Sequence, residues 1–449
     1  MKTETLTFSA LEAAKAVRNG EITCEELVQA CLDRIEEFDG EIGAWAHLSA
    51  EHALTQARQA DKFRRLGRGV GPLHGVPVGI KDIIDTKDFP TEQGSPIHQG
   101  RRPVEDATLV AKLREAGAII LGKTVTTEFA VMHPGKTVNP HDTGRTPGGS
   151  SSGSAAAVAA KMVPLAVGTQ TNGSVIRPAA FCGVVGYKPT YGLISRHRVL
   201  RQSPPLDQIG VFANSVEDAG LMAQAMMGYD DRDEATRPQA SPDLWRLLSE
   251  DPPMTPRLGF VKGPVWNQAE DSTKEAFAEL VDFLGETAEE AEIAPVFDEV
   301  IDLHRMVMEA DLAKNIGPNL ERAPDQVSKI LTEMIVRGRE VKAVAYNLAI
   351  DRIKLLPLGL DELFETYDAI ITPATAGEAP KGLETTGSPA FCTLWTFCGM
   401  PAITLPILSG AEGLPLGVQL VGRKGEDGKL LRTARWLMEQ VALDAAADA

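Results

Sequence analysis

Residues 147–178 contain two serine loops, PGGSSSGS over Pro147–Ser154 and QTNGSVIRP over Gln170–Pro178. An alanine-rich stretch, which we expect to form a short helix, joins them. Upstream, the stretch VGIKD over Val78–Asp82 places one lysine, Lys81, among apolar residues. These are the parts of a serine hydrolase that uses lysine as its base, because a buried lysine can lose its charge at neutral pH. The pattern therefore favours an enzyme over a binding module.

Outward from these loops, short buried strands alternate with amphipathic helices, which predicts one α/β domain spanning 1–449. We expect a helical N-terminal arm over 1–68, with capping residues Ser9 and Thr23, and a variable, mostly helical region over 225–350 that shapes the substrate pocket. The Asp- and Pro-rich stretch 230–251 is predicted to be a surface excursion. The expected strands are 76–84, 118–121, 163–168, 368–373, 402–406 and 417–422, and further helices are expected over 107–117, 154–161, 272–350 and 427–441.

Composition excludes several classes of function. A net charge of -17 argues against nucleic acid or an anionic membrane as the main partner. No apolar run is long enough to span a membrane, the N-terminus has no apolar signal core, and the histidines lack metal-ligand spacing. The five cysteines, an odd number without a CxxC pair, indicate reduced, packed thiols. We therefore expect a cytoplasmic protein without a cofactor or metal.

One motif match misleads. Gly117–Thr124 fits the phosphate-loop pattern GxxxxGK[ST]. In a true phosphate loop a strand precedes the first glycine, whereas here a helical pattern precedes Gly117 and four apolar residues follow it. We expect a buried strand here and no nucleotide site.

A serine nucleophile needs a base within hydrogen-bond reach. His133 and His141 flank prolines in a predicted surface loop, so Lys81 is the better candidate. The alternative for Lys81 is a buried ion pair with Asp82 or Asp85. The second loop could direct the backbone N–H groups of residues 171–174 at a developing oxyanion, or it could be a simple turn or anion nest.

Together these segments resemble the amidase signature family. The resemblance runs from GPLHGVPVGIKD at Gly71 through Gly122–Thr124 and Asn139–Pro140, and covers the whole of Arg145–Tyr191. It resumes at Ile371–Pro373 and at GLPLGVQLVG over Gly413–Gly422, and so extends over most of the chain. It implies a single α/β domain with a large mixed sheet between layers of helices.

The resemblance also implies a catalytic triad, residue by residue. Lys81 matches the family's base, Ser150 the bridging serine that follows a cis peptide bond, and Ser174 the nucleophile. Thr171, Asn172 and Gly173 match the oxyanion loop. The implied chemistry is hydrolysis of a linear amide through an acyl-enzyme.

Three departures bear on the substrate. Gln170 stands where the family usually has Asp, Asn172 where it usually has Gly, and Arg177 lies one place later than the common arginine. The loop resembles that of malonamidase-like members, in which this arginine holds a substrate carboxylate; the alternative is a structural ion pair. The resemblance therefore implies a small carboxylate-bearing or ureido-type amide and a homodimer. The alternative is the glutamine-hydrolysing A subunit of a tRNA amidotransferase, which would need partner subunits.

Overall fold

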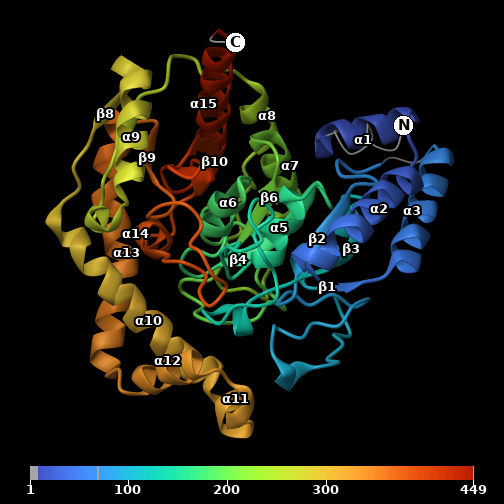
Figure 1. Ribbon diagram of the computed structural model, residues 1–449, viewed down its shortest axis with the longest axis horizontal. Helices are drawn as coiled ribbons and strands as arrows, with labels where there is room; N and C mark the ends of the chain where they lie inside the picture. Colours follow the sequence, from blue (N-terminus) through green and yellow to red (C-terminus); the bar gives the residue numbers. More distant parts are fainter. Residues whose placement is uncertain (1–8, 68–69, 448–449) are drawn as a thin grey trace.

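A mixed β-sheet forms the centre of the computed structural model, which describes residues 9–67 and 70–447 (Figure 1). Its 11 strands follow the order β1-β3-β2-β4-β6-β5-β10-β11-β9-β7-β8. The strands are β1 (Trp45–Leu48), β2 (Pro77–Lys81), β3 (Ile119–Thr124), β4 (Leu165–Gln170), β5 (Val185–Lys188), β6 (Gln208–Ala213), β7 (Leu258–Phe260), β8 (Ala288–Glu290), β9 (Ala369–Pro373), β10 (Ala402–Ser409) and β11 (Pro415–Val421). Strands β3, β2 and β4 are mutually parallel, as are β8, β7 and β9, whereas the strands between these two groups pair antiparallel.

Helices cover both faces of this sheet. They are α1 (Ala10–Asn19), α2 (Cys24–Ile42), α3 (Ala50–Arg65), α4 (Thr108–Glu115), α5 (Ser152–Ala159), α6 (Ile176–Cys182), α7 (Val216–Met226), α8 (Leu244–Ser249), α9 (Asp271–Leu284), α10 (Val300–Asn315), α11 (Gly317–Arg322), α12 (Lys329–Arg339), α13 (Ala343–Thr366), α14 (Ala390–Phe397) and α15 (Asp427–Ala447). Short 3₁₀ helices include η3 (Glu128–Ala130) and η6 (Pro295–Glu299). The predicted single-domain α/β fold, with a large mixed sheet between helices, is confirmed.

Local signals explain where the first helices begin. Ser9 and Glu12 form a reciprocal capping box at α1, and Thr23 and Glu26 form another at α2. Each box satisfies backbone N–H groups that a helix start leaves without an intrahelical partner. The strand β1, which pairs with β3, interrupts a segment for which the sequence predicted helices alone.

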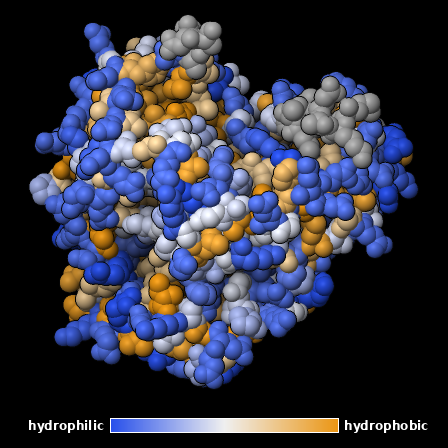
Figure 2. Space-filling model, in the orientation of Figure 1, coloured by the Kyte–Doolittle hydropathy of each residue, from blue (hydrophilic) through white to orange (hydrophobic). Residues whose placement is uncertain are grey.

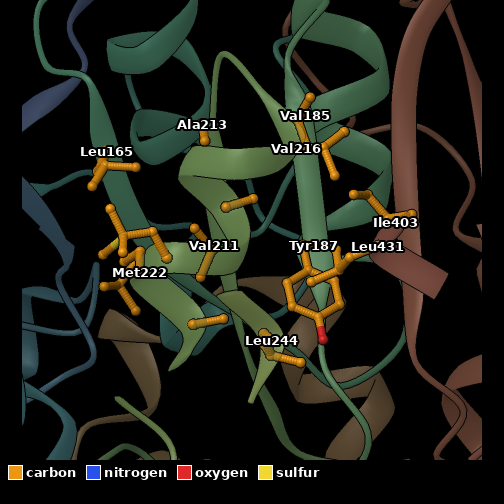
Figure 3. Close-up of a cluster of buried hydrophobic side chains, with 14 of the residues drawn as sticks. Leu165, Val185, Tyr187, Val211, Ala213, Val216, Met222, Leu244, Ile403 and Leu431 are labelled. Carbon is orange, nitrogen blue, oxygen red and sulfur yellow. The ribbon is translucent and has the colours of Figure 1, made fainter. Parts of the chain in front are cut away.

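The sheet presents apolar side chains to both layers. Figure 3 shows one side, where Val211 on β6 and Tyr187 on β5 face Met222 on α7 and Leu431 on α15. On the other side, the alanines of α5 pack with Ala166 of β4. Small side chains on α5 let it lie close to the strands. This close approach holds the two serine loops, which flank α5 and β4, against the sheet.

Two predictions about local structure have clear outcomes. Residues 119–124, inside the misleading phosphate-loop match, form the fully buried strand β3, as expected. The prediction that 230–251 is a surface excursion is wrong in part. Asp230 and Asp233 are buried and accept hydrogen bonds from Ser195 and Arg196. Leu244 and Leu248 of α8 are also buried.

The described residues contain five free, buried cysteines. No helix among them is long and apolar enough to cross a membrane. Within residues 9–67 and 70–447, no group of three or more His, Cys, Asp or Glu side chains is placed to hold a metal ion.

Candidate active site

Lys81, the last residue of β2, is fully buried and surrounded by hydroxyl groups. Its Nζ donates to Ser150 Oγ at 2.7 Å, to Ser151 Oγ at 2.9 Å and to Thr169 Oγ1 at 2.9 Å. Burial lowers the pKa of Lys81 well below its ordinary value, an effect that nearby Asp207 opposes and Arg177 reinforces. Such a lysine can give up a proton near neutral pH and act as a base.

The alternative interpretation of Lys81, an ion pair with Asp82 or Asp85, is wrong. Asp82 pairs with Lys123, whose Nζ lies 3.3 Å from Asp82 Oδ1. Asp85 pairs with Arg101, whose Nη1 lies 2.7 Å from Asp85 Oδ1. No carboxylate in the described part of the chain forms a salt bridge with Lys81, so hydroxyl groups alone solvate its amine.

Ser150 is buried in the first serine loop, and the Gly149–Ser150 peptide bond is cis. Its carbonyl accepts a hydrogen bond from Thr127 N at 3.2 Å. Gly148 precedes this bond at φ 79°, and a Cβ there would lie 2.8 Å from Pro178 Cα, so only glycine fits. The loop is thus packed directly against α6, the helix that follows Ser174.

Ser174 lies between β4 and α6 and is 9% exposed. Its hydroxyl makes no hydrogen bond with any described residue, so the structure joins Lys81 to Ser150 but shows no bond from Ser150 to Ser174. The chain after Ser174 is held by Gln170, whose Oε1 accepts from Val175 N at 2.8 Å and Ile176 N at 3.0 Å. Gln170, noted in the sequence only as a departure from the family, therefore supports the nucleophile loop.

In the loop of residues 171–174 the first three carbonyl groups accept hydrogen bonds, whereas the four N–H groups donate none to the described part of the chain. Thr171 O accepts from His304 Nε2 at 2.8 Å, Asn172 O from Thr396 Oγ1 at 2.5 Å, and Gly173 O from Arg177 N at 2.9 Å. Among the described residues, none of the four N–H groups donates a hydrogen bond. Because buried N–H groups rarely lack a partner, this loop is suited to receive an oxyanion.

The side chains of the same loop are also fixed. Asn172 Oδ1 accepts from Thr393 Oγ1 at 2.8 Å. Thr171 Oγ1 lies 2.6 Å from Gln202 Oε1 and 2.7 Å from Asp207 Oδ1. Burial raises the pKa of Asp207 to about 6, although the hydrogen bond from Thr171 acts in the opposite direction. A narrow cleft, with a water-accessible volume of about 20 Å³, lies beside this group and is lined by Thr169, Thr171, Gln202 and Asp207, among others.

His304 was not predicted from the sequence, because it lies in a helix that carries no motif. Burial lowers its pKa to about 4, so the ring is neutral at pH 7. A carbonyl oxygen can only accept, so the proton of the ring is on the Nε2 that faces Thr171. Its role is therefore to hold the loop rather than to transfer protons.

Arg177, on α6, is buried beneath the loops. Its guanidinium donates to Gly387 O at 2.5 Å and to Gly149 O at 2.6 Å. Gly149 O is the carbonyl of the peptide bond that precedes Ser150. The Nε of Arg177 is buried without a partner, and no acidic side chain of the described residues pairs with the guanidinium. Burial lowers the pKa of Arg177 to about 10. The arginine therefore braces the first serine loop while keeping an uncompensated positive charge.

Comparisons with known proteins identify the family of this chain. The family model described as Amidase matches residues 26–431. The A subunit of a glutamyl-tRNA(Gln) amidotransferase from Chloroflexus aggregans is 35% identical, over 95% of this chain and 94% of its own length. The peptide amidase from Stenotrophomonas maltophilia superimposes with a TM-score of 0.84 at 30% identity, over 97% of each chain. A protein from a vestigial complex tied to the origins of an s-triazine catabolic enzyme gives a TM-score of 0.90 at 28% identity, over 98% of each chain.

Proposed function

Since this chain belongs to the amidase signature family and is an amide hydrolase, we propose that it cleaves the C–N bond of a small-molecule amide through an acyl-enzyme on Ser174. The observation that carries the proposal is the environment of Lys81. A fully buried amine bound to three hydroxyl oxygens, without a carboxylate partner, is suited to proton transfer rather than to structural ion pairing.

In the proposed reaction, Ser174 attacks the amide carbonyl as its proton passes through Ser150 to Lys81. The free N–H groups of residues 171–174 stabilise the oxyanion of the tetrahedral intermediate. Lys81 then returns the proton, through Ser150, to the departing nitrogen, because an amide anion is a very poor leaving group. Water then attacks the acyl-enzyme as one of its protons passes through Ser150 to Lys81, and Lys81 returns that proton through Ser150 to Ser174 Oγ as the acid product leaves and ionises.

We propose that the substrate carries a carboxylate or a ureido group on a short acyl chain. The support is the guanidinium of Arg177, which is buried without an anion and is only three residues from Ser174. A buried charge without a counter-charge is unfavourable, so an anionic substrate group would gain most of its binding energy there. The region 225–350 shapes the pocket in this proposal, and its His304 supports the oxyanion loop.

A second candidate is the glutamine-hydrolysing A subunit of a tRNA amidotransferase. The relative from Chloroflexus aggregans, which has that name, matches 95% of this chain. Gln170, Asn172 and the shifted Arg177 argue against it, because they alter the loop next to the nucleophile.

One experiment separates the two candidates. The purified chain is assayed for ammonia release from half-amides of short dicarboxylic acids, ureido acids, neutral aryl amides and glutamine. Turnover of a carboxylate-bearing or ureido amide by the chain alone supports the first candidate. Glutamine turnover that appears only with co-purified partner proteins supports the second, and a preference for neutral aryl amides contradicts both.

A further inference from the structure

Two buried basic side chains hold the same dipeptide, Gly149–Ser150. Lys81 Nζ donates to Ser150 Oγ at 2.7 Å, and the guanidinium of Arg177 donates to Gly149 O at 2.6 Å. Figure 2 shows hydrophilic side chains over much of the outer surface, where water and salt screen their charges. Lys81 and Arg177 are instead 0% and 2% exposed, so water does little to weaken the repulsion between two positive charges at this dipeptide.

Few other charges act on this pair. Asp207 attracts the ammonium form of Lys81, but its carboxyl group is engaged elsewhere, since it lies 2.7 Å from Thr171 Oγ1 and accepts hydrogen bonds from two backbone N–H groups. The titratable group that acts on Arg177 is the thiol of Cys392, whose pKa burial raises to about 12, so this thiol is neutral at pH 7. In the described part of the chain, no carboxylate therefore offsets the charge of Arg177.

The two side chains hold their protons unequally. A guanidinium is far more basic than an amine, so Arg177 remains charged at pH 7 although burial lowers its pKa to about 10. Burial also lowers the pKa of Lys81, and the charge of Arg177 lowers it further. Lys81 therefore gives up its proton readily but is a weak acceptor for the proton of Ser174, because protonation creates a second cation beside the first.

Arg177 is also close to the nucleophile. Its backbone N–H donates to Gly173 O at 2.9 Å, which places Arg177 in the first turn after Ser174. Its Nε is buried without a partner among the described residues. In the proposed function this guanidinium receives the carboxylate of the substrate. A carboxylate there cancels the charge of Arg177 and so removes its repulsion of a protonated Lys81.

We propose that the carboxylate of a bound substrate activates Lys81, because by pairing with Arg177 it strengthens the lysine as an acceptor of the Ser174 proton. This inference rests on the proposed function, in which Arg177 binds that carboxylate. The step needs no co-reactant: the proton passes from Ser174 through Ser150 to Lys81, and the carboxylate stays ionised. Because coupling between two sites is reciprocal, a proton on Lys81 also tightens the binding of an anion at Arg177. Selectivity for anionic amides then lies in the rate of acylation as well as in binding.

The first test measures this coupling without turnover. Acetate, a small carboxylate, is titrated by calorimetry into Ser174→Ala at pH values from about 5 to 8, in two buffers that differ in their enthalpy of ionisation. The difference between the buffers gives the number of protons that accompany each acetate. We expect net proton uptake in Ser174→Ala. Acetate should bind without that uptake when Lys81→Met is added, and should not bind when Arg177→Met is added.

Two control variants in the Ser174→Ala chain test other titrating groups. Lys188 is 0% exposed, burial lowers its pKa to about 7, and it lies near Cys392. Lys188→Met should leave the proton uptake unchanged. Asp207→Asn should keep the uptake but move it to lower pH, because Lys81 then loses an attracting charge. Uptake that survives Lys81→Met, or that disappears in Lys188→Met, would overturn the proposal.

The second test compares two substrates of the unaltered enzyme that differ in charge. One is a half-amide of a short dicarboxylic acid, and the other carries a nitro group, which has nearly the shape of a carboxylate without its charge. We expect kcat to be about tenfold higher for the half-amide, with the acid limb of its pH profile about one pH unit higher. In Arg177→Met the two acid limbs should coincide. Two substrates that differ in KM alone would contradict activation of the base.

The outcomes separate this proposal from the function on which it rests. Acetate that binds at Arg177 without proton uptake leaves the carboxylate site intact and overturns the activation of Lys81. Acetate that does not bind, or an enzyme that prefers the nitro amide, overturns the carboxylate site and the activation with it. If the chain hydrolyses neither amide, calorimetry still decides, because Ser174→Ala is measured without turnover.

Discussion

Two buried lysines on neighbouring strands allow the proposed base to be tested against a matched control. Lys81 on β2 and Lys123 on β3 are both 0% exposed, but only Lys123 has a carboxylate partner, Asp82. We predict that Lys81→Met abolishes activity with little effect on folding. Lys123→Met should instead reduce stability and leave the folded enzyme active.

The magnitudes follow from the contacts of each lysine. Lys81→Met removes three hydrogen bonds, each contributing about 1 kcal/mol to the free energy of unfolding. It also removes the desolvation of an ammonium group, which costs several kcal/mol, so the net change should be less than about 2 kcal/mol. Lys123→Met leaves the buried carboxylate of Asp82 without its counter-charge, which lowers the free energy of unfolding by about 3–5 kcal/mol.

The assay combines kcat/KM for the best amide substrate with urea unfolding followed by circular dichroism. Loss of the base should lower kcat/KM at least about 10⁴-fold in Lys81→Met, because members of a catalytic unit fail together. Lys123→Met should stay within about tenfold of the unaltered enzyme at a temperature where it is folded. If Lys81→Met kept more than a hundredth of the activity, or if the two variants lost activity equally, Lys81 would not be the base.

Three further predictions concern the rest of the site. Ser174→Ala should lose amide hydrolysis by several orders of magnitude with unchanged circular dichroism, and a fluorophosphonate should label Ser174; peptide mapping of the label to another serine would contradict this. Arg177→Met should raise KM sharply for carboxylate-bearing amides and hardly for neutral ones, whereas an equal loss of kcat on both would mean that it only braces Gly149. Asp207 has a folded pKa of about 6, above its unfolded value, so the folded state binds the extra proton and stability rises as pH falls from 7 to 5. Asp207→Asn should remove that rise, so the free energy of unfolding from urea titrations at pH 7 should be higher for the variant by roughly 3 kcal/mol, and a constant difference across pH would refute the assignment.

Local and short-range features were predictable from the sequence. The capping pairs Ser9–Glu12 and Thr23–Glu26 act within one turn of helix, so their spacing alone predicts where α1 and α2 begin. The rejection of the phosphate loop rested on the four apolar residues 118–121, and three of them, Ile119–Leu121, form the first half of β3. The contact between Lys81 and Ser150 followed from the family resemblance rather than from spacing, since 69 residues separate the two.

The supports of the site could not be predicted, because they depend on contacts between distant segments. His304 reaches Thr171 across 133 positions, and Thr396 reaches Asn172 across 224. Neither residue lies in a motif, and a single histidine or threonine on the buried side of a helix is equally consistent with ordinary packing. The short strand β1 was missed for a similar reason, since pairing with β3 determines its conformation more than its own four residues do.

The way in which the loop of residues 171–174 is held has a consequence for how this scaffold can acquire new substrates. Its carbonyl groups are held by His304 on α10 and Thr396 on α14, so a shift of either helix that enlarged the pocket would also displace the N–H donors of the loop. A displacement of about 1 Å at reacting groups can cost about 100-fold in rate. Laboratory evolution should therefore change selectivity through exchanges of side chains on stationary helices, and His304 and Thr396 should remain unchanged in lineages that stay active.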